Sequence, residues 1–301
     1  MTKARPLCSL LAGICCALAG CATQQMPKEP GREANQQARQ EDSHVDQQVS
    51  PQAMQTLRVC ADPNNLPFSN KAGQGFENRL AQLLADAMGA RLETAWAAQR
   101  RGFIRNNLNA GRCDAVMGVP ADYGMTLNTR PYYRSTYVFV TRADARWRPQ
   151  GLDDPALARS RIGVHVIGSD NPPPAVVLAR RGLVDNVVGY SIYGDYREPN
   201  PPSALINAVA RRDVDVAIAW GPLAGYFAKR AAAPLTLTPI AQEAPALPMQ
   251  FSIAIGVRKN ERALRDRLDA LLEQKRPEID ALLREYGVPR ADGGAALSAS
   301  R

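Results

Sequence analysis

The 301 residues carry a formal net charge of +8, six cysteines and two histidines. A chain of this length can bury two hydrophobic cores. No Ser-His-Asp order, HExxH sequence, P-loop or dinucleotide fingerprint is visible, so the residues give little support to catalysis. The export signal described next excludes nucleic acid as a partner, and the basic balance fits an acidic partner, anionic lipid or plain solubility.

The N-terminus is predicted to be a lipoprotein signal peptide over residues 1–20. Lys3 and Arg5 precede an apolar run that is shorter than the about 20 residues needed to span a bilayer, which favours a cleaved signal. Leu18-Ala-Gly-Cys21 resembles a bacterial lipobox, so the thiol of Cys21 is expected to carry a diacylglycerol group. An ordinary signal with an incidental Cys is the alternative. We expect a periplasmic protein, lipid-anchored to the outer membrane if the cell has one.

Cleavage leaves Cys60 and Cys113 as the cysteines of the folded body. They can pair in an oxidising compartment. However, Cys60 is expected late on its strand and Cys113 at the start of a neighbouring strand, where the Cα separation can exceed the ~4.4–6.8 Å that a disulfide tolerates. The sequence is therefore compatible with either a disulfide or two buried free thiols. No metal site is expected, because two Cys without a nearby His make half a site.

Residues 21–54 are predicted to be a flexible tether and 289–301 a disordered tail, because their composition cannot offset the entropy of ordering. Between them strands alternate with helices, which predicts mainly parallel sheets flanked by helices. The expected strands cover 57–61, 91–95, 114–118, 136–141, 161–166, 184–188, 214–219 and 251–257. The expected helices cover 78–88, 103–110, 175–181, 203–211 and two or more segments within 261–286.

Two segments resemble the family-3 extracellular solute-binding proteins of bacteria. Leu57-Arg-Val-Cys-Ala-Asp-Pro-Asn-Asn-Leu-Pro-Phe-Ser69 is similar to their first strand and cleft loop, and Pro131-Tyr-Tyr-Arg-Ser-Thr-Tyr-Val-Phe-Val140 to the crossover strand that ends their first lobe. Amino-acid receptors of this family carry a carboxylate-binding Arg where this chain has Asp122, and an ammonium-binding Asp where it has Trp220. The resemblance therefore implies the fold without the usual amino-acid chemistry.

The implied fold is α/β, a two-lobed periplasmic-binding-protein type II fold in which each lobe is a mainly parallel sheet flanked by helices. Two crossover strands are expected to join the lobes, and ligands of such folds bind beyond the C-terminal ends of the strands. We expect a discontinuous first lobe over 55–140 and 250–288, and a second lobe over 141–249.

The segments expected at this cleft contain polar and aromatic side chains. We take as candidates for the cleft or a ligand Asp62, Asn64, Asn65, Phe68, Arg100, Arg101, Tyr132, Ser169, Trp220 and Tyr226. The loop carboxylate and amides can equally cap the backbone, and the paired Arg can clamp a carboxylate or form a solvated turn. Ser169 can simply start a helix. Trp220 is expected to make the cleft apolar together with Phe68, Tyr132 and Tyr226, with inter-lobe packing as the alternative, whereas His165 is expected to be structural.

Three further motifs narrow the resemblance. They are Gly75-Phe-Glu-Asn78, Gln99-Arg-Arg-Gly-Phe103 with Asn109-Ala-Gly-Arg-Cys-Asp114, and Tyr190-Ser-Ile-Tyr-Gly-Asp-Tyr196 with Trp220-Gly-Pro-Leu-Ala-Gly-Tyr226. They are similar to the quinoprotein-dehydrogenase-associated binding proteins, the "J" components of bacterial methanol oxidation systems. This resemblance implies a periplasmic protein encoded with a pyrroloquinoline-quinone alcohol dehydrogenase and its cytochrome c, and no cofactor or dehydrogenase activity in this chain. The lipobox departs from the many relatives that are simply soluble.

The leading hypothesis is a non-catalytic accessory lipoprotein that binds or helps assemble the quinoprotein alcohol dehydrogenase, with its cytochrome c as a second possible partner and membrane contact through lipid alone. Arg101, Arg105 and Arg112 are the candidates for partner binding, because spacings of four and seven place them near one helical face. A solvated face is the alternative. The rival functions are a receptor of an ABC importer for a ligand that is not an amino acid, and a dehydratase-like enzyme on the same fold.

Overall fold

The computed structural model describes residues 55–167, 172–192, 196–242 and 247–291. Outside the described residues lie the predicted signal peptide and tether with Cys21, the candidate residue Ser169 and most of the predicted tail. What the sequence indicates for these residues stays a prediction. Within the described ranges, no helix combines the length and the apolar character needed to cross a bilayer.

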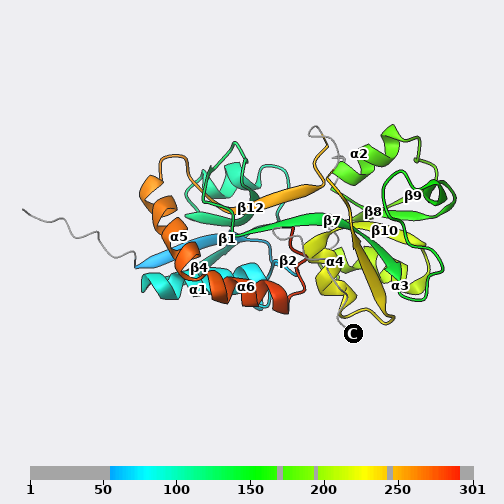
Figure 1. Cartoon of the computed structure of the whole chain (residues 1–301). Helices are drawn as coiled ribbons and strands as arrows, with labels where there is room; N and C mark the ends of the chain where they lie inside the picture. The colour runs from blue at the N-terminus through cyan, green and yellow to red at the C-terminus, as the bar shows by residue number, and fades with distance from the viewer. Residues whose placement is uncertain (1–54, 168–171, 193–195, 243–246, 292–301) are drawn as a thin grey trace, which may run out of the picture. The chain divides into compact units, whose positions relative to one another are not determined.

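Short strands and helices alternate along the chain (Figure 1). The strands are β1 (Thr56–Ala61), β2 (Asn64–Asn65), β3 (Ser69–Asn70), β4 (Arg91–Trp96), β5 (Ala115–Pro120), β6 (Leu127–Asn128), β7 (Tyr133–Arg142), β8 (Ile162–Val166), β9 (Val187–Ser191), β10 (Val216–Trp220), β11 (Leu235–Pro239) and β12 (Gln250–Val257). The α-helices are α1 (Phe76–Met88), α2 (Pro173–Arg180), α3 (Ala204–Arg211), α4 (Gly221–Ala228), α5 (Arg262–Gln274) and α6 (Arg276–Glu285). Three shorter helices are the π-helix η1 (Ile104–Leu108) and the 3-10 helices η2 (Pro155–Arg159) and η3 (Pro201–Ser203).

The strand order β4-β1-β5-β12-β7-β10-β8-β9 places β7 between two groups of strands. In the first lobe, β1 pairs in parallel with β4 and β5, and β12 runs antiparallel to β5. In the second lobe, β8 pairs in parallel with β9 and β10. The long strand β7 pairs antiparallel with β12 and then with β10 and β11, so it belongs to both groups (Figure 1). The lobe boundaries expected from the sequence stay a prediction.

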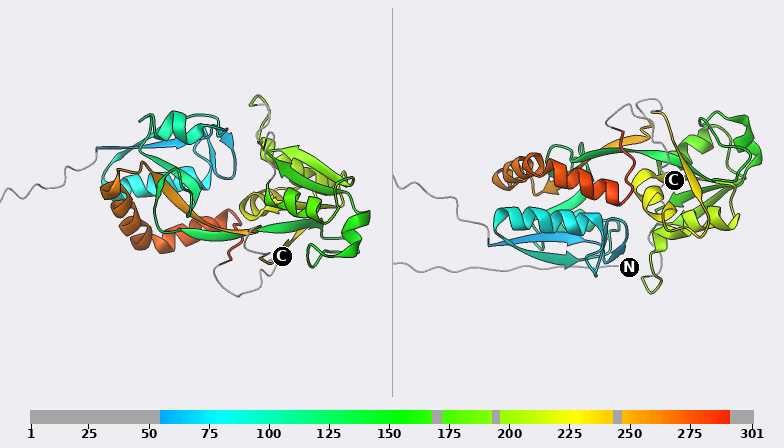
Figure 2. Two further views of the ribbon diagram at one scale, coloured as in Figure 1. Left: turned by 90° about the horizontal axis from the view of Figure 1, so that it is seen from above. Right: turned by 60° about the horizontal axis from the view of Figure 1, so that its bottom comes forward.

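Helix α1 follows from a simple apolar pattern. Leu80, Leu84 and Met88 recur every four residues and are buried. The side chain of Asn78 accepts a hydrogen bond from the backbone N–H of Gly75, which caps the first turn. The helix ends where Gly89 adopts a φ of 65°, a conformation that glycine reaches at little cost. Its buried face packs on β1 and β4 and beside α5 and α6 (Figure 2).

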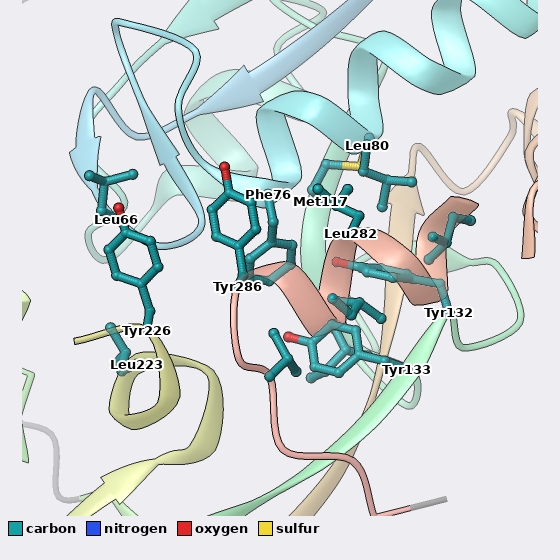
Figure 3. Packing of buried hydrophobic residues seen from close by; sticks show 14 of the residues in the cluster. Leu66, Phe76, Leu80, Met117, Tyr132, Tyr133, Leu223, Tyr226, Leu282 and Tyr286 are labelled. Carbon is teal, nitrogen blue, oxygen red and sulfur yellow. The ribbon is translucent and has the colours of Figure 1, made fainter. Parts of the chain in front are cut away.

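One apolar cluster continues from the first lobe into α4 of the second. Figure 3 shows Tyr226 of α4 close to Leu66, with Tyr286 between Tyr226 and Phe76. The rings of Tyr226 and Tyr286 are stacked with centroids 5.6 Å apart, and Tyr286 meets Phe76 edge-on at 5.8 Å. The lobes are therefore packed together near the crossover strands.

Several elements differ from the sequence-based expectation, among them η1, β9 and β11. The helix expected over 103–110 is the short π-helix η1, in which Asn109 N–H reaches the carbonyl of Ile104. The buried positions there follow α-helical spacing, so the pattern does not reveal the wider turn. Strand β9 covers Val187–Ser191, three residues later than the strand expected over 184–188, because its pairing with β8 rather than the apolar residues sets its bounds. Strand β11 was not expected.

Candidate functional site

A cavity of about 390 Å³ lies along β5 and at its C-terminal end. It is lined by Gln99, Arg100, Arg101, Gly102, Phe103, Ile104, Arg105, Val116, Gly118, Val119, Pro120, Tyr123, Met125 and Ile167. Ile167 directly follows β8 of the second lobe, while the other lining residues belong to the first. The cavity therefore opens where strands from both lobes end, which is where ligand sites of open α/β sheets lie.

Three exposed arginines, Arg100, Arg101 and Arg105, line this cavity and are called the arginine rim below. The predicted helical stripe is wrong in its geometry. Helix η1 covers Ile104–Leu108 alone, so Arg101 and Arg112 both lie outside it. Arg112 is exposed but does not line the cavity. The loop and the short π-helix, rather than an α-helical face, bring Arg101 and Arg105 to the same cavity.

The carboxylate of Asp62 is buried at 1% exposure and already fully engaged. Its oxygens accept hydrogen bonds from the backbone N–H of Asn64 at 2.8 Å, from the backbone N–H of Gln99 at 2.7 Å and from the hydroxyl of Tyr196 at 2.7 Å. Asp62 therefore both caps its own loop and contacts the second lobe. A carboxylate with three such donors has little capacity left for a small ligand.

The neighbouring amides divide these tasks. Asn64 donates to the carbonyl of Glu198 at 2.8 Å and accepts from the backbone N–H of Asn200 at 3.3 Å, so it bridges to the second lobe. The side-chain N–H₂ group of Asn65 donates to the side chain of Gln99 at 3.2 Å, and its side-chain amide oxygen has no hydrogen-bond partner among the described residues.

The aromatic candidates do not line the cavity. Tyr132 is fully buried in the first-lobe core, where its hydroxyl lies 3.4 Å from Glu77, so its expected place at the cleft is wrong (Figure 3). Tyr226 is also buried, because it stacks on Tyr286. Phe68 is half-buried and packs edge-on against Phe76 with centroids 5.5 Å apart.

Trp220 ends β10 and is half-buried at the junction of the lobes. Its ring lies edge-on to Tyr137 at 5.3 Å and to Phe251 at 5.7 Å. It borders a small internal cavity with Ile167, but not the cavity of the arginine rim. Inter-lobe packing, the alternative left open by the sequence, describes this environment.

Glu77 is a titratable residue beside the cavity-lining Gly118 that the sequence did not single out. Its carboxyl group lies against Gly118, where the carbon of any larger side chain would collide with it and where φ is 71°. Burial raises the pKa of Glu77 to about 8, while the hydrogen bond from Tyr132 opposes that shift. Glu77 is thus mostly protonated at neutral pH. Its position in Gly75-Phe-Glu-Asn78 was visible, but its burial against Gly118 was not.

The Cys60–Cys113 disulfide is present in the structure, with Cα atoms 5.5 Å apart. It joins the end of β1 to the segment after η1, so it ties down the chain that carries the arginine rim. The two sulfurs are close because β1 and β5 are adjacent parallel strands. The sequence-based concern about their separation does not apply.

His165 has a structural environment. Its Nε2 lies 3.1 Å from the carbonyl oxygen of Pro202, and burial lowers its pKa to about 4, so the ring is neutral at pH 7. In the part of the chain that the structure describes, no group of three or more His, Cys, Asp or Glu is placed to hold a metal ion.

Comparisons with known proteins agree with this architecture. The model of the bacterial extracellular solute-binding proteins, family 3, matches residues 57–288. Protein MoxJ of Methylorubrum extorquens is 35% identical over 78% of this chain and 81% of its own length. The crystal structure of MxaJ from Methlophaga aminisulfidivorans MPT has a TM-score of 0.70 and 29% identity over 78% of this chain and 99% of that one. The periplasmic binding protein XoxJ from Methylobacterium extorquens AM1 has a TM-score of 0.65 and 35% identity over 79% of this chain and 100% of that one. The predicted fold class is confirmed.

Proposed function

Because this chain belongs to the bacterial extracellular solute-binding proteins of family 3, we propose that it is a non-catalytic periplasmic accessory protein of a pyrroloquinoline-quinone alcohol dehydrogenase, which it binds or helps to assemble. The similarity to MoxJ, MxaJ and XoxJ over nearly the whole folded part supports a role in methanol oxidation. The quinone, the metal and the electron transfer to cytochrome c belong to the partner. Anchoring through lipid on Cys21 is part of the proposal.

The arginine rim is the observation that carries this function. Arg100, Arg101 and Arg105 line one cavity whose other walls include Phe103, Val119 and Met125. Cationic groups around an apolar floor suit an acidic segment of a protein partner with one or more apolar side chains. Free amino acids fit poorly, because the positions of the usual charged clamp hold Asp122 and Trp220 and because Asp62 is already saturated.

Charge reversal tests the rim. Arg101→Glu with Arg105→Glu should slow association with the purified dehydrogenase at least about tenfold at low salt, and rising salt should slow the wild type in the same way. Arg112→Glu is the matched control, since it reverses an exposed charge in the same segment but away from the cavity. Equal association rates for all three proteins would refute a role for the rim.

The proposal as a whole is tested in cells. Deleting the gene should lower alcohol dehydrogenase activity, and a pull-down from membranes of alcohol-grown cells should recover the dehydrogenase. The purified chain alone should show no turnover of alcohols. Full activity in the deletion strain together with no complex at low salt would exclude the accessory role.

A receptor for an ABC importer is the second candidate, because a cavity of about 390 Å³ is large enough for a small solute. We expect no micromolar binding of any standard amino acid in calorimetry, since an α-carboxylate or ammonium buried without a charged partner costs several kcal/mol. Micromolar binding would show that the clamp has moved, for example to the arginine rim, and would favour the receptor.

A further inference from the structure

We propose that residues 196–200 form a latch that holds the second lobe against the first without a bound ligand. In a hinged binding protein a ligand usually supplies the contacts between the lobes. Here side chains of the chain itself supply such contacts at the end of β1, on the first-lobe loop that follows that strand. This inference concerns the protein alone and does not depend on the identity of its partner.

The first contact is the hydrogen bond from the Tyr196 hydroxyl to the Asp62 carboxylate, 2.7 Å long and linking residues 134 positions apart. Two backbone N–H groups, from Asn64 and Gln99, already hold the side chain of Asp62 in one orientation. Formation of the hydrogen bond with Tyr196 therefore costs no further conformational entropy at Asp62. A short bond to a buried charged acceptor is among the stronger hydrogen bonds in proteins.

The second contact is the amide of Asn64, which binds the backbone of the latch at two points. Its N–H₂ group donates to the carbonyl of Glu198 at 2.8 Å, and its oxygen accepts from the N–H of Asn200 at 3.3 Å. Asn200 has a φ of 53°, a left-handed conformation that asparagine tolerates better than most residues. One side chain thus recognises the latch as it would a short peptide.

The third contact joins the latch to the cavity wall. The guanidinium of Arg100 lies over the ring of Tyr196, 5.3 Å from its centroid. Arg100 and Gln99 both line the cavity of about 390 Å³, and Gln99 also donates to Asp62. Release of Tyr196 would therefore free one of the arginines of the rim and loosen the cavity wall at the same time.

The latch contacts lie apart from the packing of the lobes near the crossover strands. The lobes are also packed near the crossover strands, where Tyr226 stacks on Tyr286. The latch joins separate segments of the two lobes, namely the loop after β1 and the segment after β9. Removing it should leave the stacking of Tyr226 on Tyr286 in place and let the latch move away from Asp62 and Asn64, by a rotation of the second lobe about the crossover strands.

Two substitutions test the latch with little change in volume at the core. Tyr196→Phe removes the hydroxyl but keeps the ring under Arg100, and Asn64→Ala removes the two backbone contacts. In the ligand-free double variant we expect a larger radius of gyration by small-angle X-ray scattering. We also expect amide exchange at Asn200 to be about tenfold faster or more. The single Tyr196→Phe variant should show a smaller change in the same direction.

Tyr190→Phe is the matched control, because Tyr190 is a half-buried tyrosine of β9 that makes no contact with Asp62 or Asn64 among the interactions described. It should scatter and exchange like the wild type. The latch is refuted if the folded Tyr196→Phe protein and the double variant both match the wild type in scattering and in exchange at Asn200. It is also refuted if the ligand-free wild type already has a radius of gyration as large as that of the double variant.

Discussion

Replacing Cys60 and Cys113 with Ala together should cost the protein a large part of its stability. The disulfide closes a loop with a sequence separation of 53 residues. In the chain-entropy relation a loop of that length reduces the entropy of the unfolded chain enough to stabilise the fold by about 4 kcal/mol at 25 °C. Whole proteins are stable by only about 5–15 kcal/mol, so this one bond is a substantial fraction.

The native state offers little compensation for losing the bond. Both sulfurs are buried, Cys60 at 2% and Cys113 at 0% exposure, so the substitution also removes packed atoms. The ion pair of Arg58 with Asp114 still joins β1 to the same segment before β5, but it does not restrict the unfolded chain. The entropic loss should therefore appear almost in full.

Urea unfolding followed by tryptophan fluorescence and by circular dichroism measures this loss. We expect the midpoint to fall with little change in native spectra, and the single Cys60→Ala variant to lose nearly as much, since either substitution breaks the bond. A loss below about 1 kcal/mol, with coincident transitions in both probes, would refute the argument that the closed loop dominates.

Three further outcomes are expected. Burial raises the pKa of Glu77 to about 8 from an ordinary 4.5, so between these pH values the folded state binds more protons than the unfolded state. The free energy of unfolding should therefore fall as the pH rises from 4.5 to 8, by up to about 1.4 kcal/mol per pH unit. Urea midpoints for Glu77→Gln should lack this slope, and equal slopes would contradict the assignment. Burial lowers the pKa of His165 to about 4 from 6.5, so stability should be lost as the pH falls from 6.5 to 4. The urea midpoints of His165→Gln should vary less with pH over that range, and an unchanged pH dependence would contradict a buried neutral ring. Cys21→Ala should abolish incorporation of labelled lipid and leave unprocessed precursor, whereas Cys60→Ala should keep its membrane attachment; normal maturation of the first variant would exclude the lipobox.

Local sequence patterns predicted most elements because their causes are local. Leu80, Leu84 and Gly89 are sufficient to place α1, and the apolar run before Asp62 is sufficient to place β1. The same reasoning placed the edge strand β9 three residues too early and missed both strand β11 and the π-helical form of η1, since neither hydrogen-bond pairing nor the width of a helical turn changes the spacing of apolar residues.

The sequence predicted part of the arginine rim. Arg100 and Arg101 are adjacent in the chain and precede a helical segment, so their common place at the cavity was expected. The exclusion of Arg112 was not, because the expected α-helical spacing assumed a helix long enough to include it. Tyr132 was misplaced for a different reason: it directly precedes β7, and whether a side chain at the start of a strand is buried depends on what packs against it.

Residue types, their order and the motifs by themselves indicated the two-lobed fold, and they predicted that the amino-acid clamp is missing, since Asp122 and Trp220 can be read directly from the sequence. The tertiary structure alone decided what the loop after β1 contacts. Asp62 and Tyr196 are 134 residues apart, and their hydrogen bond exists because two lobes built from separate stretches of chain meet there. The pKa of Glu77 is likewise raised only because the fold removes water from its carboxyl group beside Gly118. Contacts between distant segments and the loss of water around a charge depend on packing in three dimensions, and no local spacing of residues encodes them.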